Sequence, residues 1–170
     1  MKKVVFESKN IYFIELSYDL IEDYLEMVNN PKINKLISLK NKIYTYEDEM
    51  EWVKMKLNSD EVIFSMLDKK TGKFIGNISF MKIENNTAEI GISITENSQN
   101  QHYGTEALER MIKYGFEVLN LNEIKLGVFS TNLRAIHCYK KLGFTEYDVE
   151  ENIGNIDGED VDGLLMKLHK

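Results

Sequence analysis

Gln99-Asn100-Gln101-His102-Tyr103-Gly104-Thr105 is a polar stretch that is predicted to join a strand to a helix, and it belongs to the most informative part of the sequence. The strand before the loop, over 88–95, alternates apolar and polar residues, and the chain after Gly104 has helical periodicity. A helix N-terminus carries about half a positive charge and four unpaired N–H groups, so it binds phosphates readily. Gly104 would let an anion approach the backbone, and Thr105 would add a hydroxyl donor. The pattern indicates an anion site, although an ordinary joint with Thr105 as the helix cap has the same residues.

A second informative segment, Asn132–Phe144, reads NLRAIHCYKKLGF. It predicts a short helix over 133–142 that Asn132 caps and Gly143 stops, with two lysines in its last turn. Tyr139 shares a face of this helix with apolar residues. The spacing alone leaves two alternatives open: a core tyrosine, or a tyrosine whose hydroxyl faces a site.

Hydrophobic periodicity predicts elements in the order β-α-α-β-β-β-α-β-α-β-β. The sequence therefore predicts one α+β domain over 1–170, with a mixed β-sheet of about seven strands and about four helices. The second helix starts at a capping box on Thr45 and carries Met50, Val53 and Leu57 at helical spacing. The other expected ranges are strands at 10–16, 62–68, 73–83, 88–95, 123–130, 144–151 and 161–169, and helices at 18–29, 104–119 and 133–142.

Composition favours a soluble, cytoplasmic protein of a single domain. The chain has 170 residues, of which 43% are hydrophobic, and its single cysteine, Cys138, cannot form an internal disulfide. The basic N-terminus is followed by too short an apolar run for a signal peptide, and no stretch is long enough to span a bilayer. The net charge of −7 opposes binding to nucleic acid. No histidine or acidic spacing indicates a metal site, so none is expected.

The two segments together resemble the GCN5-related N-acetyltransferase (GNAT) family. The loop is similar to the family's acyl-CoA loop, Gln/Arg-x-x-Gly-x-Gly/Ala, and Asn132–Phe144 is similar to its Asn-x-x-Ala-x-x-x-Tyr-x-x-x-Gly-Phe run. The resemblance covers nearly the whole chain and is strongest to the spermidine and ribosomal-protein N-terminal acetyltransferases. One residue departs from the pattern, because His102 stands where the family has its first loop glycine. A side chain there resists a positive φ and crowds a diphosphate.

The resemblance implies a GNAT-like fold that uses acetyl-CoA as a cosubstrate. It implies that the backbones of Ile92, Ser93 and Ile94 pair with the pantetheine arm like an added strand. It also implies that Asn132 contacts the pantetheine or orients the tyrosine helix. The amides expected to hold the diphosphate are those of Gln99, Asn100, Gln101, His102, Tyr103, Gly104 and Thr105.

The resemblance also implies direct attack of an amine on the thioester, without a covalent enzyme intermediate. Tyr139 is then expected to donate a proton or a hydrogen bond to the departing thiolate. Glu89, which projects from the strand opposite the face of Ile92 and Ile94, is a candidate to accept the proton of the amine, either directly or through a water. An exposed strand acid with no such role would have the same sequence.

The acceptor is expected to be a small primary amine, a polyamine such as spermidine or spermine. Seven acids and no basic residue lie between Asp148 and Asp162, and Glu150, Glu151 and Asp157 are expected to attract a polycation. A solvated acidic hairpin is the alternative. Other acceptors that fit are an aminoglycoside or a protein N-terminus, and a non-catalytic acyl-CoA-binding module is a further alternative. The resemblance allows a homodimer, but the sequence does not show an interface.

Overall fold

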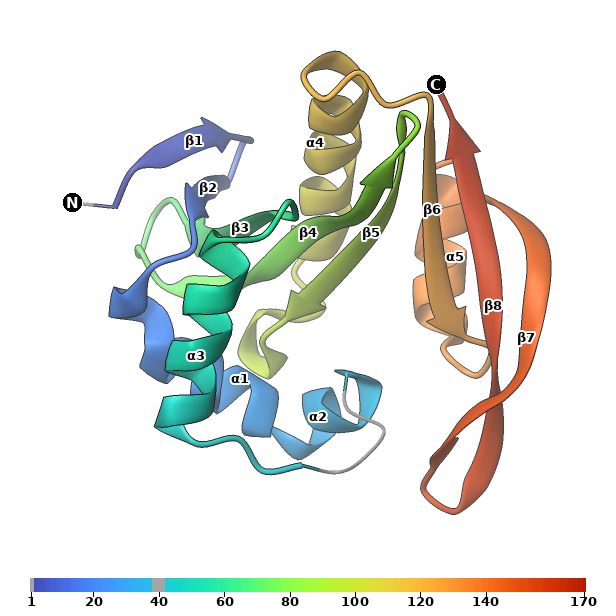
Figure 1. Cartoon of the computed structure of the whole chain (residues 1–170), viewed down its shortest axis with the longest axis horizontal. Coiled ribbons are helices and arrows are strands. Elements are labelled where there is room, and N and C mark those ends of the chain that lie inside the picture. Colours follow the sequence, from blue (N-terminus) through green and yellow to red (C-terminus); the bar gives the residue numbers. More distant parts are fainter. Residues whose placement is uncertain (1, 38–41) are drawn as a thin grey trace.

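The computed structural model describes residues 2–37 and 42–170, which form one mixed sheet with helices on both faces (Figure 1). The sheet has eight strands in the order β1-β2-β3-β4-β5-β6-β8-β7. The strands are β1 Val4–Glu7, β2 Ile11–Glu15, β3 Val62–Asp68, β4 Phe74–Glu84, β5 Thr87–Ile94, β6 Glu123–Phe129, β7 Thr145–Ile156 and β8 Glu159–His169. The helices are α1 Ile21–Asn29, α2 Pro31–Ile37, α3 Tyr46–Leu57, α4 Tyr103–Glu117 and α5 Leu133–Lys141, with short 3₁₀ turns at Tyr18–Leu20 and Glu96–Ser98.

The α+β class and the mixed sheet are confirmed, and the two extra elements have simple physical causes. Val4–Glu7 adds a strand because its apolar residues extend the sheet beside β2. Pro31 ends α1 as expected, but it also begins α2, since proline fits the first turn of a helix. The side chain of Asn30 accepts a hydrogen bond from the Lys32 amide at 3.0 Å and supports this new start.

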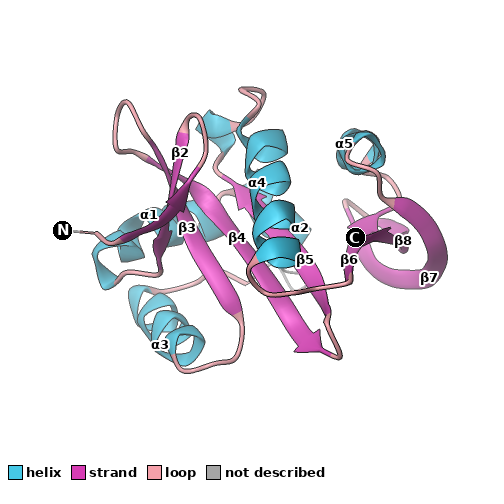
Figure 2. Cartoon of the chain, turned by 90° about the horizontal axis from the view of Figure 1, so that it is seen from above, coloured by secondary structure: helices cyan, strands magenta, loops and turns pink. Residues whose placement is uncertain are grey.

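Two hydrophobic clusters cover the two faces of the sheet. One contains residues of α4 and α5, and the other contains residues of α1, α2 and α3. Phe13 belongs to the first cluster and Ile14 to the second, because successive strand residues point to opposite faces. Figure 2 shows α4 and α3 on opposite sides of the strands.

The buried face of α3 differs from the expected one. Met50 is 37% exposed and Leu57 is 49% exposed, whereas Val53 is buried as expected. Glu49, a charged residue on the same helix, is only 4% exposed. The helix is therefore rotated so that an acid, and not Met50, lies beside Val53 on the inner face.

The C-terminal strands are longer than the sequence indicated. We expected a polar loop between 151 and 161, but β7 and β8 continue to a two-residue turn at Asp157 and Gly158. Both turn residues have positive φ, 53° and 88°, as the tight turn of a hairpin requires. A register irregularity between Glu150 and Gly154 lets the polar strand remain in the ladder.

The arrangement of β5 and β6 creates the opening that matters for function. These parallel neighbours pair only at their starts, Thr87–Glu89 with Glu123–Lys125. β6 then follows β8 along its whole length, while β5 stays with β4. Figure 1 shows β5 and β6 close together at one end and apart at the other. The β6-facing backbone edge of residues 91–94 is therefore left without a strand partner.

Candidate active site

A cavity of about 370 Å³ occupies the opening between β5 and β6, and we call it the cleft cavity. Ile33, Leu36 and Ile37 of α2 also border it. Of the residues singled out from sequence, seven lie together on its wall: Ile92, Ser93, Ile94, Gln99, Asn132, Tyr139 and Glu150. The fold thus brings the strand, the loop, the tyrosine helix and the acidic hairpin to one place.

Gly76 on β4 holds the β5 wall of the cleft cavity in position. It stands opposite Ile94 in the ladder, and a Cβ built on it would lie 2.0 Å from the Ser93 carbonyl oxygen. Any side chain here would push β5 away from β4. The close approach of these two backbones therefore sets where Ser93 and Ile94 meet the cavity.

Tyr139 lies on α5 with its ring against Phe144, at 5.9 Å between ring centroids and 65° between planes. Burial, and then the neighbouring Cys138, raise the pKa of Tyr139 to about 12. Within the described part of the chain its hydroxyl forms no hydrogen bond. The side chain is therefore a neutral phenol at any ordinary pH, with a donor available to a molecule in the cleft cavity.

Asn132 and Thr105 fix the helix that carries Tyr139. The Asn132 side chain accepts a hydrogen bond from the Ala135 amide at 3.2 Å, so it is the N-cap of α5 as the sequence predicted. The Thr105 hydroxyl lies 3.5 Å from the Cys138 sulfur, and this contact links the first turn of α4 to α5. Cys138 packs between the two helices and does not line the cleft cavity.

The start of α4 has the features of an anion site. Its N-cap is His102, so the alternative that Thr105 caps the helix is wrong. The first backbone bond of this helix runs from the Glu106 amide to the His102 carbonyl, and the amides of 102–105 donate no hydrogen bond to the described residues. Space around Gly104 is open, because a Cβ there would have no atom within 4 Å.

His102 adopts the conformation that a glycine would favour. Its φ is 65° and its ψ is 4°, in the left-handed region, and Asn100 has a φ of 60°. The substitution therefore keeps the path of the loop at the cost of some backbone strain. His102 itself is exposed, so its imidazole does not fill the interior of the loop.

Side-chain hydrogen bonds hold the loop from outside the cleft cavity. The Tyr103 hydroxyl donates to Asp68 at 2.5 Å, and the Asp68 carboxylate also accepts from Thr71, which together hold the pKa of Asp68 at about 2. The Gln101 side chain donates to the Asn97 carbonyl at 2.6 Å. Gln101 and Tyr103 border a separate cavity of about 690 Å³, so these two side chains face away from the cleft cavity.

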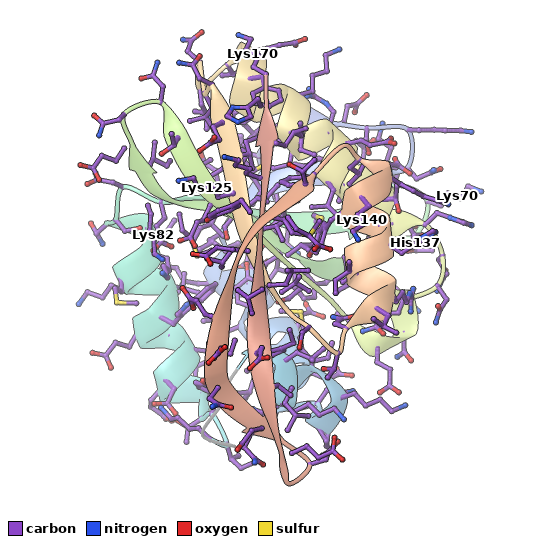
Figure 3. All side chains as sticks on the ribbon, turned by 90° about the vertical axis from the view of Figure 1, so that its right-hand side faces the viewer. Lys70, Lys82, Lys125, His137, Lys140 and Lys170 are labelled. Atoms are coloured by element: carbon purple, nitrogen blue, oxygen red, sulfur yellow. The ribbon has the colours of Figure 1, made fainter. Side chains whose placement is uncertain are left out.

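Glu89 is not on the wall of the cleft cavity. It lies on β5 at the last position paired with β6, opposite Lys125, and its carboxylate forms an ion pair with Lys82 at 2.5 Å. This ion pair raises the pKa of Lys82. In Figure 3 Lys82 and Lys125 lie on the side of the β7–β8 hairpin away from α5. The sequence placed Glu89 on the correct strand but gave no sign of its lysine partner.

The three hairpin acids have different surroundings. Glu150 borders the cleft cavity, Glu151 is exposed, and Asp157 forms an ion pair with Lys35 of α2 at 3.2 Å. A bridge between exposed groups of this kind contributes little to stability, but it ties the hairpin tip to α2. The structure therefore places Glu150 at the cleft cavity, while Asp157 is already paired with Lys35.

A further cavity of about 490 Å³ was not expected, and we call it the aromatic cavity. It shares Ile37, Ile92 and Ser93 with the cleft cavity, so the two are neighbours across β5. Its wall includes Tyr24, Tyr44, Trp52, Glu49, Met81 and the ion pair between Lys56 and Glu61. The signal that could have found it is the spacing of Glu49, Trp52 and Val53, which places an acid and an indole on the inner side of α3.

The described residues contain no group of three or more metal-binding side chains close enough to hold an ion. None of their helices is long and apolar enough to cross a membrane.

A sequence-family model described as an acetyltransferase (GNAT) domain matches residues 10–145, which include both motifs and the strands β5 and β6 that border the cleft cavity. The chain belongs to the GNAT family. Among relatives of this GNAT acetyltransferase, acetyltransferase PseH of Campylobacter jejuni is 31% identical over 144 residues, 85% of this chain and 88% of that protein. The spermidine N(1)-acetyltransferase of Escherichia coli is 43% identical, but over 58 residues that cover 34% of this chain and 31% of the relative.

A solved structure supports the fold of this GNAT protein. The spermidine N-acetyltransferase of Vibrio cholerae, in complex with CoA and spermine, superposes with a TM-score of 0.87 and covers 94% of this chain and 95% of its own. The sequence identity is 22%, so this likeness shows the fold and does not assign the acceptor. Membership of the family makes the protein an acetyltransferase, and acetyl transfer to an amine is what the names of its relatives support.

Proposed function

We propose that this GNAT enzyme transfers an acetyl group from acetyl-CoA to a primary amine of a small polycation, a polyamine such as spermidine or spermine. The observation that carries the proposal is the cleft cavity, whose wall joins an unpaired strand edge, Gln99 from the loop before α4, and a phenol whose donor is unused by the described residues.

The backbone of Ile92, Ser93 and Ile94 is the proposed partner of the pantetheine arm. This edge of β5 has no strand beside it, so its N–H and C=O groups can bond an extended chain. The amides at the start of α4 are the proposed diphosphate site, because four of them donate to no described residue and no side chain covers Gly104. The amides of Asn100 and Gln101 are the further proposed donors of this loop, whereas the Gln99 amide already donates to the Glu96 carbonyl at 3.2 Å.

Tyr139 is the proposed donor to the leaving group. The amine nitrogen attacks the thioester carbon, a tetrahedral intermediate forms, and the C–S bond breaks with both electrons going to sulfur. An ordinary thiol has a pKa of about 8.5, and the Tyr139 pKa of about 12 makes complete proton transfer to the thiolate uphill by about 5 kcal/mol. Tyr139 therefore acts by hydrogen-bonding the developing thiolate and not by becoming a phenolate.

Glu89 is the proposed acceptor of the proton that the amine loses. It borders neither the cleft cavity nor the aromatic cavity, so it would receive the proton through a water. The Glu89 carboxylate is already paired with the Lys82 ammonium group at 2.5 Å. The ion pair with Lys82 therefore competes with transfer of the amine proton to Glu89. Removing Lys82 should change the pH dependence of kcat.

Acidic charge near the cavity supports a cationic acceptor. Glu150 is on the wall itself, and the strands around it carry exposed acids such as Glu151. A field of this sign raises the local concentration of a polycation, and it weakens as salt is added. The PseH relative covers more of this chain than the spermidine enzyme of Escherichia coli does, so the polyamine assignment rests on charge and not on the relatives.

The proposal is tested by an acceptor-panel assay that follows release of free CoA thiol with polyamines, aminoglycosides and peptides with free N-termini. Polyamines should give the highest kcat/KM. Turnover confined to N-terminal peptides would contradict the polyamine assignment but keep the reaction. Calorimetry with acetyl-CoA separates the remaining case: binding without turnover on any amine would contradict catalysis altogether.

A further inference from the structure

Glu49 is a buried carboxylate for which the reaction described above has no use. It is 4% exposed, and it forms no hydrogen bond or ion pair through its side chain with any residue in 2–37 or 42–170. Burial raises the pKa of Glu49, the neighbouring Asp48 raises it further, and Lys42 lowers it. An ionised group in this position is costly, so a fold that keeps one needs a compensating partner.

The surroundings of Glu49 indicate what that partner is. The carboxylate is on the wall of the aromatic cavity together with the rings of Tyr24, Tyr44 and Trp52. The other charged side chains on this wall, Lys56 and Glu61, neutralise each other at 2.6 Å. A carboxylate among aromatic faces, with no partner in the described part of the chain, is a suitable environment for an alkylammonium group, which gains both an ion pair and cation–π contacts.

The aromatic cavity adjoins the place where acetyl transfer is proposed. It shares Ile37, Ile92 and Ser93 with the cleft cavity, so one elongated molecule can extend from one cavity into the other. An acceptor with two amino groups would then place one beside β5 and the other beside Glu49. An acceptor with a single amino group would leave the carboxylate buried and without a partner.

We propose that Glu49 binds the second ammonium group of a diamine-type acceptor, so that the aromatic cavity is the subsite that selects acceptors with two amino groups. The proposal rests on the proposed function, since it concerns the acceptor of the same reaction. It assigns Glu49 a role in specificity, because the group it holds is not the amine that reacts.

The test uses Trp52, the only tryptophan of the chain, as a reporter inside the aromatic cavity. Its fluorescence is titrated with 1,4-diaminobutane and with 1-aminobutane, without acetyl-CoA, in the wild type, in Glu49→Gln and in Glu51→Gln. Glu51 is an exposed acid on the same helix, so its variant is matched in charge and in chemistry. The wild type and Glu51→Gln should bind the diamine roughly 10-fold to 100-fold more tightly than the monoamine, the range of one charge-assisted hydrogen bond. Glu49→Gln should lose this preference.

Three further measurements separate a binding role from a structural one. The melting temperature of Glu49→Gln should equal or exceed that of the wild type, because the variant removes a buried charge that no described residue pairs with. Its Kd for acetyl-CoA should be unchanged. In the acetylation assay the KM for the diamine should rise with little change in kcat.

Three results would overturn the inference. One is a wild-type Trp52 signal that responds equally to both amines, and another is an intact diamine preference in Glu49→Gln. The third is a fall in kcat for Glu49→Gln with no rise in KM, which would make Glu49 a proton acceptor instead. If the wild type acetylates no amine, the proposed function fails, yet the fluorescence titration still decides whether Glu49 holds a second ammonium group.

Discussion

Replacing Tyr139 by Phe removes one oxygen atom from the wall of the cleft cavity and leaves the rest of the side chain in place. The ring keeps its edge contact with Phe144, 5.9 Å between centroids, so α5 should keep its position. No hydrogen bond to a described residue is lost, because the hydroxyl makes none. The variant therefore tests the phenolic donor and not the fold.

The size of the effect follows from what the donor does. A hydrogen bond to a developing anion in a partly desolvated site contributes roughly 3–4 kcal/mol, so we expect Tyr139→Phe to lower kcat by roughly 10²-fold to 10³-fold. The KM for acetyl-CoA should change little, since the donor is used when the C–S bond breaks. Because the pKa of Tyr139 is about 12, the wild-type kcat should show no alkaline decline from this group below about pH 11.

The assay is initial-rate release of free thiol at saturating acetyl-CoA, with the Kd for acetyl-CoA measured separately by calorimetry. A Tyr139→Phe enzyme with kcat within about threefold of the wild type would refute the role of Tyr139, since one lost donor in this setting should cost far more. An increase in the Kd for acetyl-CoA of the same size as the loss of kcat would show instead that the residue binds the coenzyme.

The other predictions concern the loop, the contact between β4 and β5, and the hairpin. Gly104→Val should raise the Kd for acetyl-CoA at least 10-fold in calorimetry, because its side chain enters the open space before the α4 amides, and its melting temperature should stay that of the wild type. Gly76→Ala should unfold at a lower temperature than the wild type, since its Cβ would lie 2.0 Å from the Ser93 carbonyl oxygen. Asp68→Asn should raise that Kd roughly twofold to tenfold by loosening Tyr103. Because the folded pKa of Asp68, about 2, lies below its usual 3.8, the wild type should lose stability as pH falls from about 4 toward 2, and the variant should show less of this loss in thermal melts. Neutralising Glu150 and Glu151 should raise the KM for a polyamine and make that KM less dependent on salt concentration. A KM that changes neither with salt in the wild type nor on neutralisation would contradict attraction by the hairpin.

The parts of the fold that the sequence predicted well are those with local signals. The loop Gln99–Thr105 and the segment Asn132–Phe144 carry their turn, cap and stop residues within a few positions, so the helices after them begin within one residue of where they were expected. The alternation over 88–95 predicted β5 for the same reason. Asn132 is the N-cap because its side chain reaches an amide three residues away, which is a property of the local chain.

What the sequence did not predict depends on tertiary contacts. Val4–Glu7 becomes a strand because β2 is available to pair with it, and 151–156 extends β7 because β8 continues beside it. The divergence of β5 and β6 depends on where their pairing stops, and no residue type in either strand predicts that position. Lys82 could not be matched to Glu89 for the same reason.

The candidate site shows the same division. Tyr139 and the loop were found through motifs, whereas Glu49 and the aromatic cavity were missed. The helical spacing of Met50 and Leu57 favoured an apolar inner face for α3, and the structure turns an acid inward instead. A residue that breaks the hydrophobic pattern of a helix at a buried position is a sign of function, but only the structure shows that the position is buried.

The most direct test of the account is a crystal structure of the protein with CoA bound. The diphosphate should lie against the α4 amides near Gly104, the pantetheine should run along Ile92–Ile94, and the sulfur should lie within hydrogen-bonding distance of the Tyr139 hydroxyl. A diphosphate bound elsewhere, or a sulfur out of reach of that hydroxyl, would contradict the account.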